Sequence, residues 1–129
     1  MRVADWPERL AALLEERRHA PFAYGTQDCA TFAAAAVEAV TGERRWEPPY
    51  STEREALRLM GGDLVGAVGD VLGAAVTPSR ARRGDLVVLL ADDGRQVLGV
   101  CIGERAAAPA LDGLVFPPMS QAVAAWRID

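Results

Sequence analysis

Asp28 and Cys29 open an apolar stretch with helical spacing and follow the approach Tyr24-Gly25-Thr26-Gln27. This pattern predicts a thiol at the N-terminus of a helix, where free backbone N–H groups and the helix dipole favour an anion. A nucleophilic cysteine also needs a base that takes the thiol proton and returns it to the leaving group. The chain has one histidine, His19, and it precedes the cysteine. The sequence therefore predicts a cysteine-hydrolase scaffold without the usual base.

The bulk composition is that of a single globular domain over residues 1–129. Apolar residues make up 50% of the chain, charged residues 25%, and the net charge is −4. An acidic chain of this kind argues against nucleic acid as a partner. No stretch approaches the roughly 20 apolar residues that span a bilayer, and the N-terminus lacks a signal-peptide pattern. We therefore expect no membrane insertion and a cytoplasmic location during synthesis.

The first half of the chain carries helical periodicity. Trp6, Leu10 and Leu13 fall on one face of an expected helix over residues 5–18. A capping box at Thr52 and Glu55 begins another helix that ends at Gly61-Gly62. The full set of expected helices is residues 5–18, 28–41, the one that begins at Thr52, and residues 63–72.

The second half changes to the period of strands. Residues 85–91 and 97–102 are apolar runs joined by Asp92-Asp93-Gly94, a strong hairpin signal. Shorter strands are expected around Ala107 and over residues 114–116 and 123–128, with breaks at Pro109 and Pro117-Pro118. Helices followed by strands predict an α+β fold, with N-terminal helices packed on a C-terminal antiparallel sheet.

Four motifs in this order resemble the NlpC-like branch of the papain-like cysteine peptidases. They are Tyr24-Gly25, Asp28-Cys29, Gly84-Asp85-Leu86 and Val97-Leu98-Gly99-Val100. The resemblance implies a papain-like core with Cys29 as the nucleophile and Tyr24 and Asp28 lining its site. It places the family's base at Val97, which cannot accept a proton, and the orienting residue near residues 106–108, where no side chain is polar. By resemblance, the nucleophile is present and its two partners are absent.

The chain as a whole looks most like a subgroup found in phages and prophage-like clusters, where related domains are attached to the tail tip. The resemblance thus implies a catalytically degenerate domain that serves as a structural or assembly component of a phage-like tail tip. Its partners would be other tail proteins, with peptidoglycan peptides as a second candidate. We expect no cofactor and no metal, since Asp92-Asp93 before a glycine is typical of a turn.

Three alternatives remain open at this level. The chain could be an active peptidase or amidase that cuts peptidoglycan peptides through Cys29, with a base from His19, an unrecognised residue or a neighbouring subunit. Cys29 could instead be an inert buried thiol, because free cysteine is often buried. A redox role for Cys29 and Cys101 is the weakest, since the expected strand holds the two residues apart.

Overall fold

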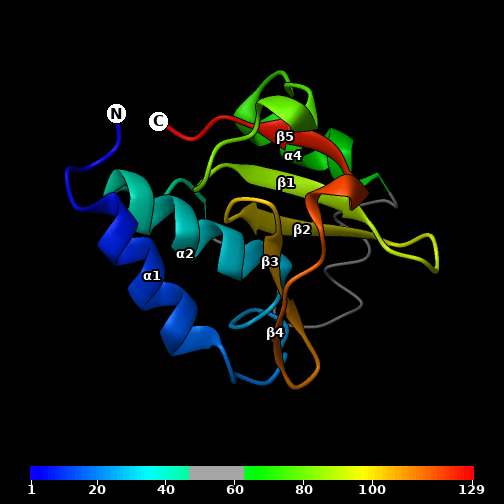
Figure 1. Cartoon of the computed structure of the whole chain (residues 1–129), viewed down its shortest axis with the longest axis horizontal. Helices are drawn as coiled ribbons and strands as arrows, with labels where there is room; N and C mark the ends of the chain where they lie inside the picture. Colours follow the sequence, from blue (N-terminus) through cyan, green and yellow to red (C-terminus); the bar gives the residue numbers. More distant parts are fainter. Residues whose placement is uncertain (47–62) are drawn as a thin grey trace.

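The computed structural model describes residues 1–46 and 63–129. Its described helices are α1 (Trp6–Arg17), α2 (Cys29–Thr41) and α4 (Leu64–Leu72), and short 3₁₀ helices lie at Pro78–Arg80 and Met119–Gln121. The strands are β1 (Leu86–Leu90), β2 (Gln96–Cys101), β3 (Ala106–Ala110), β4 (Gly113–Val115) and β5 (Ala122–Trp126). They form an antiparallel sheet in the order β4-β3-β2-β1-β5 (Figure 1). The predicted α+β fold, with helices first and an antiparallel sheet after them, is confirmed.

The described helices begin and end at their local sequence signals. Pro7 lies in the first turn of α1, where its missing N–H breaks no helical hydrogen bond. Asp28 caps the start of α2, and Gly42 ends it with a φ of +80°. The predicted helix that begins at Thr52 lies outside the described residues. The other three predicted helices are confirmed over residues 5–18, 28–41 and 63–72.

The predicted hairpin between the two long strands is confirmed. Leu90 pairs with Gln96 at the open end of the turn. Within the turn, the Gly94 N–H donates to the Ala91 carbonyl at 2.9 Å, and Gly94 has a φ of +88°. A glycine is favoured in this left-handed conformation, so Asp92-Asp93-Gly94 reverses the chain without strain.

The prediction that Pro109 interrupts the sheet is wrong, because Pro109 lies inside β3 opposite Leu114. The Leu114 N–H donates to the Arg18 carbonyl at 2.9 Å, so it points away from β3. Pro109 and Leu114 therefore form a non-hydrogen-bonded pair, and the proline nitrogen faces the β2 side. The pairing of β3 with β2 covers only Ala106 and Ala107. A missing N–H at this position consequently breaks no ladder bond.

The remaining strand predictions hold with small shifts. β4 and β5 each begin one residue before the predicted start, and β5 ends at Trp126, before the predicted end. Pro117-Pro118 separates these two strands, as expected.

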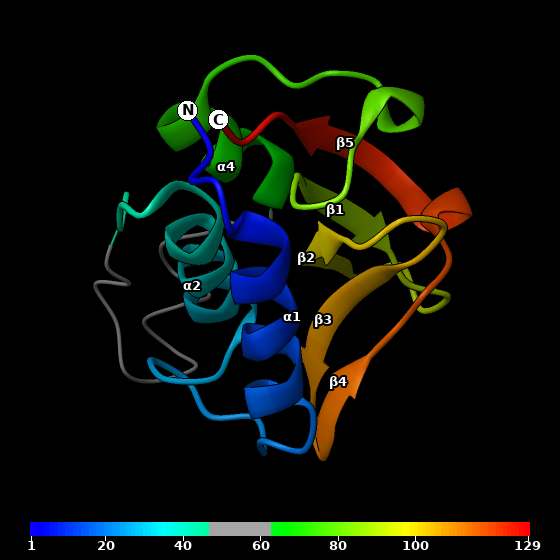
Figure 2. The ribbon, with the colours of Figure 1, turned by 60° about the vertical axis from the view of Figure 1, so that its left-hand side comes forward.

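The sheet separates two apolar clusters. The cluster on the helical side contains Leu98 and Val100 of β2 together with buried residues of α1, α2 and α4. Figure 2 shows α1 and α2 together on this side of the sheet. The other cluster contains Val87, Leu89 and Cys101, and residues of the loops and of the start of β5 pack against it. Alternate residues of a strand point to opposite faces, so the two clusters fix which β2 side chains meet the helices.

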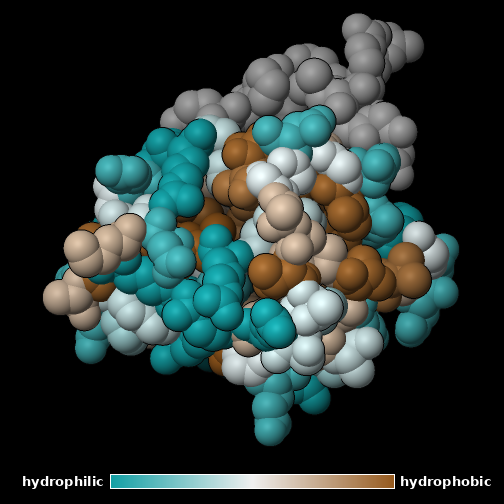
Figure 3. All heavy atoms as spheres, turned by 90° about the horizontal axis from the view of Figure 1, so that it is seen from above, coloured by the Kyte–Doolittle hydropathy of each residue, from teal (hydrophilic) through white to brown (hydrophobic). Residues whose placement is uncertain are grey.

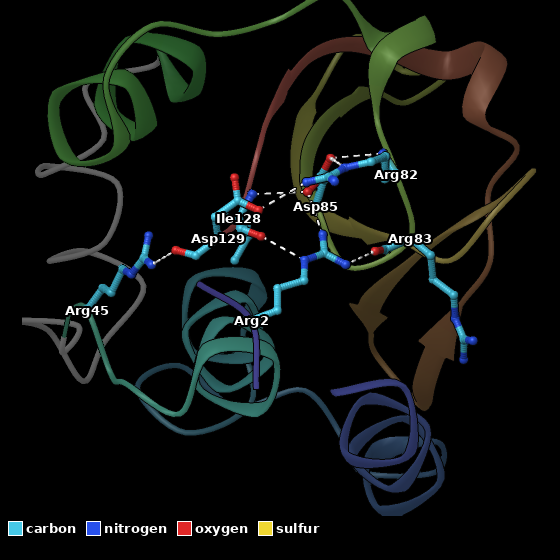
Figure 4. A network of polar contacts seen from close by, with 7 residues as sticks. All are labelled: Arg2, Arg45, Arg82, Arg83, Asp85, Ile128 and Asp129. Carbon is cyan, nitrogen blue, oxygen red and sulfur yellow. Dashed lines mark hydrogen bonds and ion pairs between the residues drawn. The ribbon is translucent and has the colours of Figure 1, made fainter. Parts of the chain in front are cut away.

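The ends of the described chain are tied together by Arg2. Its guanidinium donates to the Ile128 carbonyl at 2.8 Å and to the Arg83 carbonyl at 2.7 Å, and it forms an ion pair with Asp85 at 2.8 Å (Figure 4). The same guanidinium lies over the ring of Trp6, 4.3 Å from its centroid. This network holds the segment before α1 against the start of β1 and the end of β5.

The surface seen from above Figure 1 combines a hydrophilic region with hydrophobic patches (Figure 3). α4 and β5 lie on this side of the molecule in Figure 1. Val71 of α4 is 58% exposed and Val123 of β5 is 48% exposed. No helix in residues 1–46 or 63–129 has the length and apolar character needed to cross a membrane.

Candidate functional site around Cys29

A tight turn leads the chain into α2. Ala23 and Gln27 pair across it, with the Gln27 N–H donating to the Ala23 carbonyl at 2.7 Å. Gly25, at the centre, has a φ of +86°. The rings of Phe22 and Tyr24 meet edge to face with their centroids 4.8 Å apart. Tyr24, predicted to line the site, is thus part of the turn that delivers the cysteine to the helix.

Asp28, the second predicted lining residue, is the N-cap of α2 and is only 2% exposed. Its Oδ1 accepts from the Thr31 N–H at 2.9 Å, and its Oδ2 accepts from the Gly25 N–H at 2.7 Å. The Thr31 hydroxyl accepts from the Asp28 N–H at 2.8 Å and completes a reciprocal capping box. Asp28 therefore fixes both the turn before α2 and the first turn of the helix.

Cys29 is the first residue of α2, as predicted, and its side chain is half-buried. Burial raises the pKa of the thiol, and the negative charge of Asp28 raises it further. Backbone hydrogen bonding at Leu98, Cys29 and Ala30 acts in the opposite direction, but the net direction is upward. The raised pKa lowers the fraction of thiolate at neutral pH, and a thiol is a much weaker nucleophile than a thiolate.

The structure does not bring the Val97 side chain together with Cys29. Val97 pairs directly with Leu89, which belongs to the cluster on the far face of the sheet. Leu98 belongs to the cluster on the helical face, and Cys29 packs against that cluster. Because directly paired residues share a face, Val97 lies on the side of β2 away from α2. The strand residue beside the sulfur is Leu98, which sequence reasoning did not single out.

His19 lies at a separate place in the fold. It follows α1 and lines an open depression of about 460 Å³, together with Arg18 and residues 110–116 of the β3–β4 hairpin. Cys29 does not line this depression. Gly113 packs so closely there that a Cβ atom would lie 3.1 Å from the His19 Cα. The His19 backbone thus lies against the β3–β4 hairpin, and the residue is exposed.

Cys101 lies on the opposite side of the sheet from Cys29. It is 1% exposed and packs in the far-face cluster, whereas Cys29 packs against the helical-face cluster. Its Sγ lies 3.5 Å from the Gly103 carbonyl, to which it donates. Burial raises the pKa of this thiol as well. Both cysteines are free. Because they lie on opposite faces of the sheet, the two thiols that a redox pair would require are kept apart.

Asp92 and Asp93 belong to the hairpin turn. The Asp93 carboxylate accepts from the Arg95 backbone N–H at 3.0 Å and from its guanidinium at 2.7 Å. These contacts lower the pKa of Asp93. In the described ranges, no three His, Cys, Asp or Glu side chains gather in a way that could hold a metal ion.

A family comparison covers almost the whole chain. The model of DUF6950, a domain of unknown function, matches residues 1–128. The chain belongs to the DUF6950 family. A search among curated proteins gives no match. Because the match spans both the helices and the sheet, the site around Cys29 lies within this DUF6950 domain.

One buried contact in this DUF6950 domain has no evident sequence signal. Gln27, two residues before the cysteine, is 5% exposed, and its Oε1 accepts a hydrogen bond from the Arg17 guanidinium. Its Nε2 is buried and has no hydrogen-bond partner within the described structure. A glutamine in a loop and an arginine at a helix end each have ordinary explanations in a sequence, so nothing predicts that they meet. The contact ties the end of α1 to the turn before α2.

At this DUF6950 site the thiol lies at the N-terminus of α2, beside backbone groups of Cys29 and Ala30 in α2 and of Leu98 in β2. Such groups can orient the sulfur or a bound carbonyl group. They cannot move a proton between the thiol and a leaving group, which is the task of a base. The residues around Cys29 are therefore suited to holding a group in place.

Proposed function

We propose that this chain is a catalytically degenerate NlpC-like domain that serves as a structural or assembly component of a phage-like tail tip. The observation that carries the proposal is the separation of its only histidine from the thiol. His19 is exposed and lines the open depression at the β3–β4 hairpin, whereas Cys29 packs against the helical face of β2. The proposed partners are other tail proteins, with peptidoglycan peptides as a second candidate.

The rate enhancement that a general base supplies is large, so its absence favours a loss of turnover. General acid–base catalysis contributes about 10²–10⁴ in rate, and loss of one member of a cooperative triad can cost about 10⁶. The raised pKa of Cys29 reduces the thiolate population further. No group near the sulfur in the described residues compensates for both deficits.

The motifs behind the NlpC resemblance have structural roles in this chain, which supports retention of a scaffold. Asp28 caps α2, and Asp85 is a fully buried acceptor for Arg2 and for the Ile128 N–H. Gly99 leaves no room for a side chain, since a Cβ atom there would lie 2.9 Å from the Ala107 carbonyl oxygen. Selection for the fold alone would preserve all three residues while the base position changed.

A hydrolysis assay tests the enzymatic side of the proposal. The purified protein is incubated with peptidoglycan-derived peptides, beside Cys29→Ala and Cys101→Ala variants as a matched pair. We expect no hydrolysis above the buffer blank for any of the three, and no trapping of Cys29 by an electrophilic peptide mimic at neutral pH. Hydrolysis that is lost in Cys29→Ala and kept in Cys101→Ala would establish the active peptidase instead.

A particle assay tests the structural side. The gene is deleted in a strain that produces the particle, and is separately replaced by the Cys29→Ala form. We expect deletion to abolish complete tails in electron micrographs and Cys29→Ala to leave them intact, because assembly depends on the folded surface. Intact, infectious particles after deletion would contradict a structural role, and loss of tails in Cys29→Ala would contradict a role independent of the thiol.

A further inference from the structure

We infer that the β3–β4 hairpin and the end of α1 form a self-complementary surface, on which a second copy of this chain docks about a two-fold axis. The inference goes beyond the proposed function, because it concerns a surface that Cys29 does not line and a partner that the proposed function does not name. The hairpin and the end of α1 lie side by side, at the end of the molecule away from the chain termini (Figures 1 and 2).

Exposed apolar side chains gather at the hairpin. Leu111 is 77% exposed, Val115 47% and Phe116 36%, and all three line the open depression of about 460 Å³ beside His19. A leucine that stays in water contributes little to folding, whereas its burial against another molecule is favourable. A depression of this volume is in the range that takes a whole small molecule, so it can take the leucine side chain of another copy.

The same depression carries charges of both signs. Arg18 and His19 line it just after α1, and Asp112 lines it from the hairpin turn. Within the described residues Asp112 forms no ion pair, and the carboxylate near the Arg18 guanidinium is that of Glu15 at 3.8 Å, with both side chains largely exposed. Exposed pairs of this kind are weak, so both Asp112 and Arg18 are available to another molecule.

A second copy fits this distribution of charge better than a partner that carries one sign. In a two-fold contact each pair of residues occurs twice, so Asp112 of one copy meets Arg18 or His19 of the other, and the reverse. Leu111 of each copy then lies in the depression of the other. An acidic or a basic segment of a different protein would satisfy one sign and leave the other facing a like charge. The contact uses one surface of each copy and therefore closes at two copies.

The surface is held in place before a partner arrives. The Phe22 N–H donates to the Leu111 carbonyl at 3.1 Å, and the Leu114 N–H donates to the Arg18 carbonyl at 2.9 Å. These bonds fix the hairpin turn and the end of α1 relative to each other. Docking therefore orders few additional groups and loses little conformational entropy.

Sedimentation equilibrium measures the association. The concentration of the chain runs from about 10 µM to about 1 mM, because a surface smaller than the roughly 20–30 residues a side of a standard interface associates weakly. Leu111→Asp is the test variant. Val71→Asp is the matched control, because Val71 of α4 is 58% exposed and does not line the depression. Circular dichroism establishes that each variant folds.

We expect the parent protein and Val71→Asp to change from monomer to dimer at the same concentration. Leu111→Asp should raise the dissociation constant by at least about tenfold, since burial of a leucine side chain is worth that factor in affinity. A parent that stays monomeric throughout, a Leu111→Asp variant that dimerises as the parent does, or an equal loss in both variants would overturn the inference.

An exchange of charges tests the two-fold pairing. Asp112→Arg and Arg18→Glu each place like charges opposite one another, so each variant alone should be monomeric at concentrations where the parent is dimeric. An equimolar mixture of the two should dimerise, because both contacts then join an arginine to an acid. A mixture that stays monomeric, or single variants that dimerise as the parent does, would refute the contact between two copies.

This test and the tests of the proposed function fail separately. A monomeric parent that does not hydrolyse peptidoglycan peptides would remove the contact between two copies and leave the proposed function standing. A dimer that hydrolyses those peptides would support the contact and overturn the proposed loss of catalysis.

Discussion

The Arg2 guanidinium lies 2.8 Å from the Oδ1 atom of Asp85, a carboxylate that is fully buried before β1. The same oxygen accepts from the Ile128 N–H at 3.0 Å, and Oδ2 accepts from the Arg82 N–H at 2.8 Å. A carboxylate with no access to water must have such partners, since an unpaired buried charge is strongly destabilising. The Gly-Asp-Leu motif therefore joins three segments of the chain at one point (Figure 4).

Substitution of Arg2 by alanine should lower the free energy of unfolding by about 2–4 kcal/mol, because the buried Asp85 would lose the closer of its two arginine partners and keep only Arg82, whose guanidinium lies 3.9 Å away. The Ile128 and Arg83 carbonyls would lose a donor as well. Urea denaturation followed by circular dichroism measures the change.

Arg95→Ala is the matched control for this prediction. Arg95 forms an ion pair with Asp93 at 2.7 Å, but the two side chains are 79% and 55% exposed. Water and salt screen exposed ion pairs, so the stability of the control should be close to that of the parent protein. Equal losses for Arg2→Ala and Arg95→Ala would contradict the role of burial.

Two glycines should respond to alanine with opposite signs. A Cβ atom at Gly99 would lie 2.9 Å from the Ala107 carbonyl oxygen, and one at Gly69 in α4 would meet nothing within 4 Å. Gly99→Ala should therefore destabilise by about 1–3 kcal/mol through overpacking. Gly69→Ala should stabilise by about 0.5–1 kcal/mol, because alanine favours a helix over glycine. Thermal unfolding of both variants checks the pair, and a stabilising Gly99→Ala would refute the packing of β2 against β3.

Local signals were sufficient to predict the helices and the strands that lie within residues 1–46 and 63–129. The spacing of Trp6, Leu10 and Leu13 predicts one face of a helix, and Gly94 after two aspartates predicts a turn. Both predictions succeed because a helix face and a turn depend on residues that are close in the sequence. Pro109 was misread for the converse reason. Whether a strand tolerates proline depends on its partners on both sides, and these are set by the sheet order rather than by the local sequence.

The candidate site was predictable only in part, for the same physical reason. The position of Cys29 at a helix start follows from the residues around it. The face of β2 that meets α2 depends on the register with β1, in which Leu89 pairs with Val97 and Val88 pairs with Leu98. A shift of one residue exchanges the two faces, and the apolar run over residues 97–102 has no alternation that distinguishes them.

A histidine introduced at Val97 should not restore peptidase activity. Val97 shares a face with Leu89 and lies on the side of β2 away from Cys29. An imidazole there would not reach the sulfur, and a base must be within about 3.2 Å or one water molecule of the proton it takes. The assay uses the peptidoglycan peptides described above and compares Val97→His with the parent protein. Hydrolysis in Val97→His that disappears in the Val97→His/Cys29→Ala double variant would show that this position does face the thiol.

Stability should fall as the solution becomes alkaline, because burial raises the pKa of both Cys29 and Cys101 in the folded state. In the unfolded chain the thiols titrate near roughly pH 8.5, so above that pH the folded state retains protons that the unfolded state has lost. Below about pH 8.5 these two thiols therefore give the free energy of unfolding no dependence on pH. Above that pH the free energy of unfolding decreases, until the pH has passed the raised pKa of the folded state.

Urea denaturation at intervals between about pH 7.5 and 9.5 tests this dependence, in a range below the ordinary pKa of tyrosine. In the Cys29→Ala/Cys101→Ala double variant the decrease should be smaller, whatever the absolute stability lost through the smaller side chains. The single variants divide the effect between the two faces of the sheet. An identical slope in the parent and the double variant would mean that neither thiol has a raised pKa in the folded state, and the account of Cys29 as a half-buried thiol with a raised pKa would then fail.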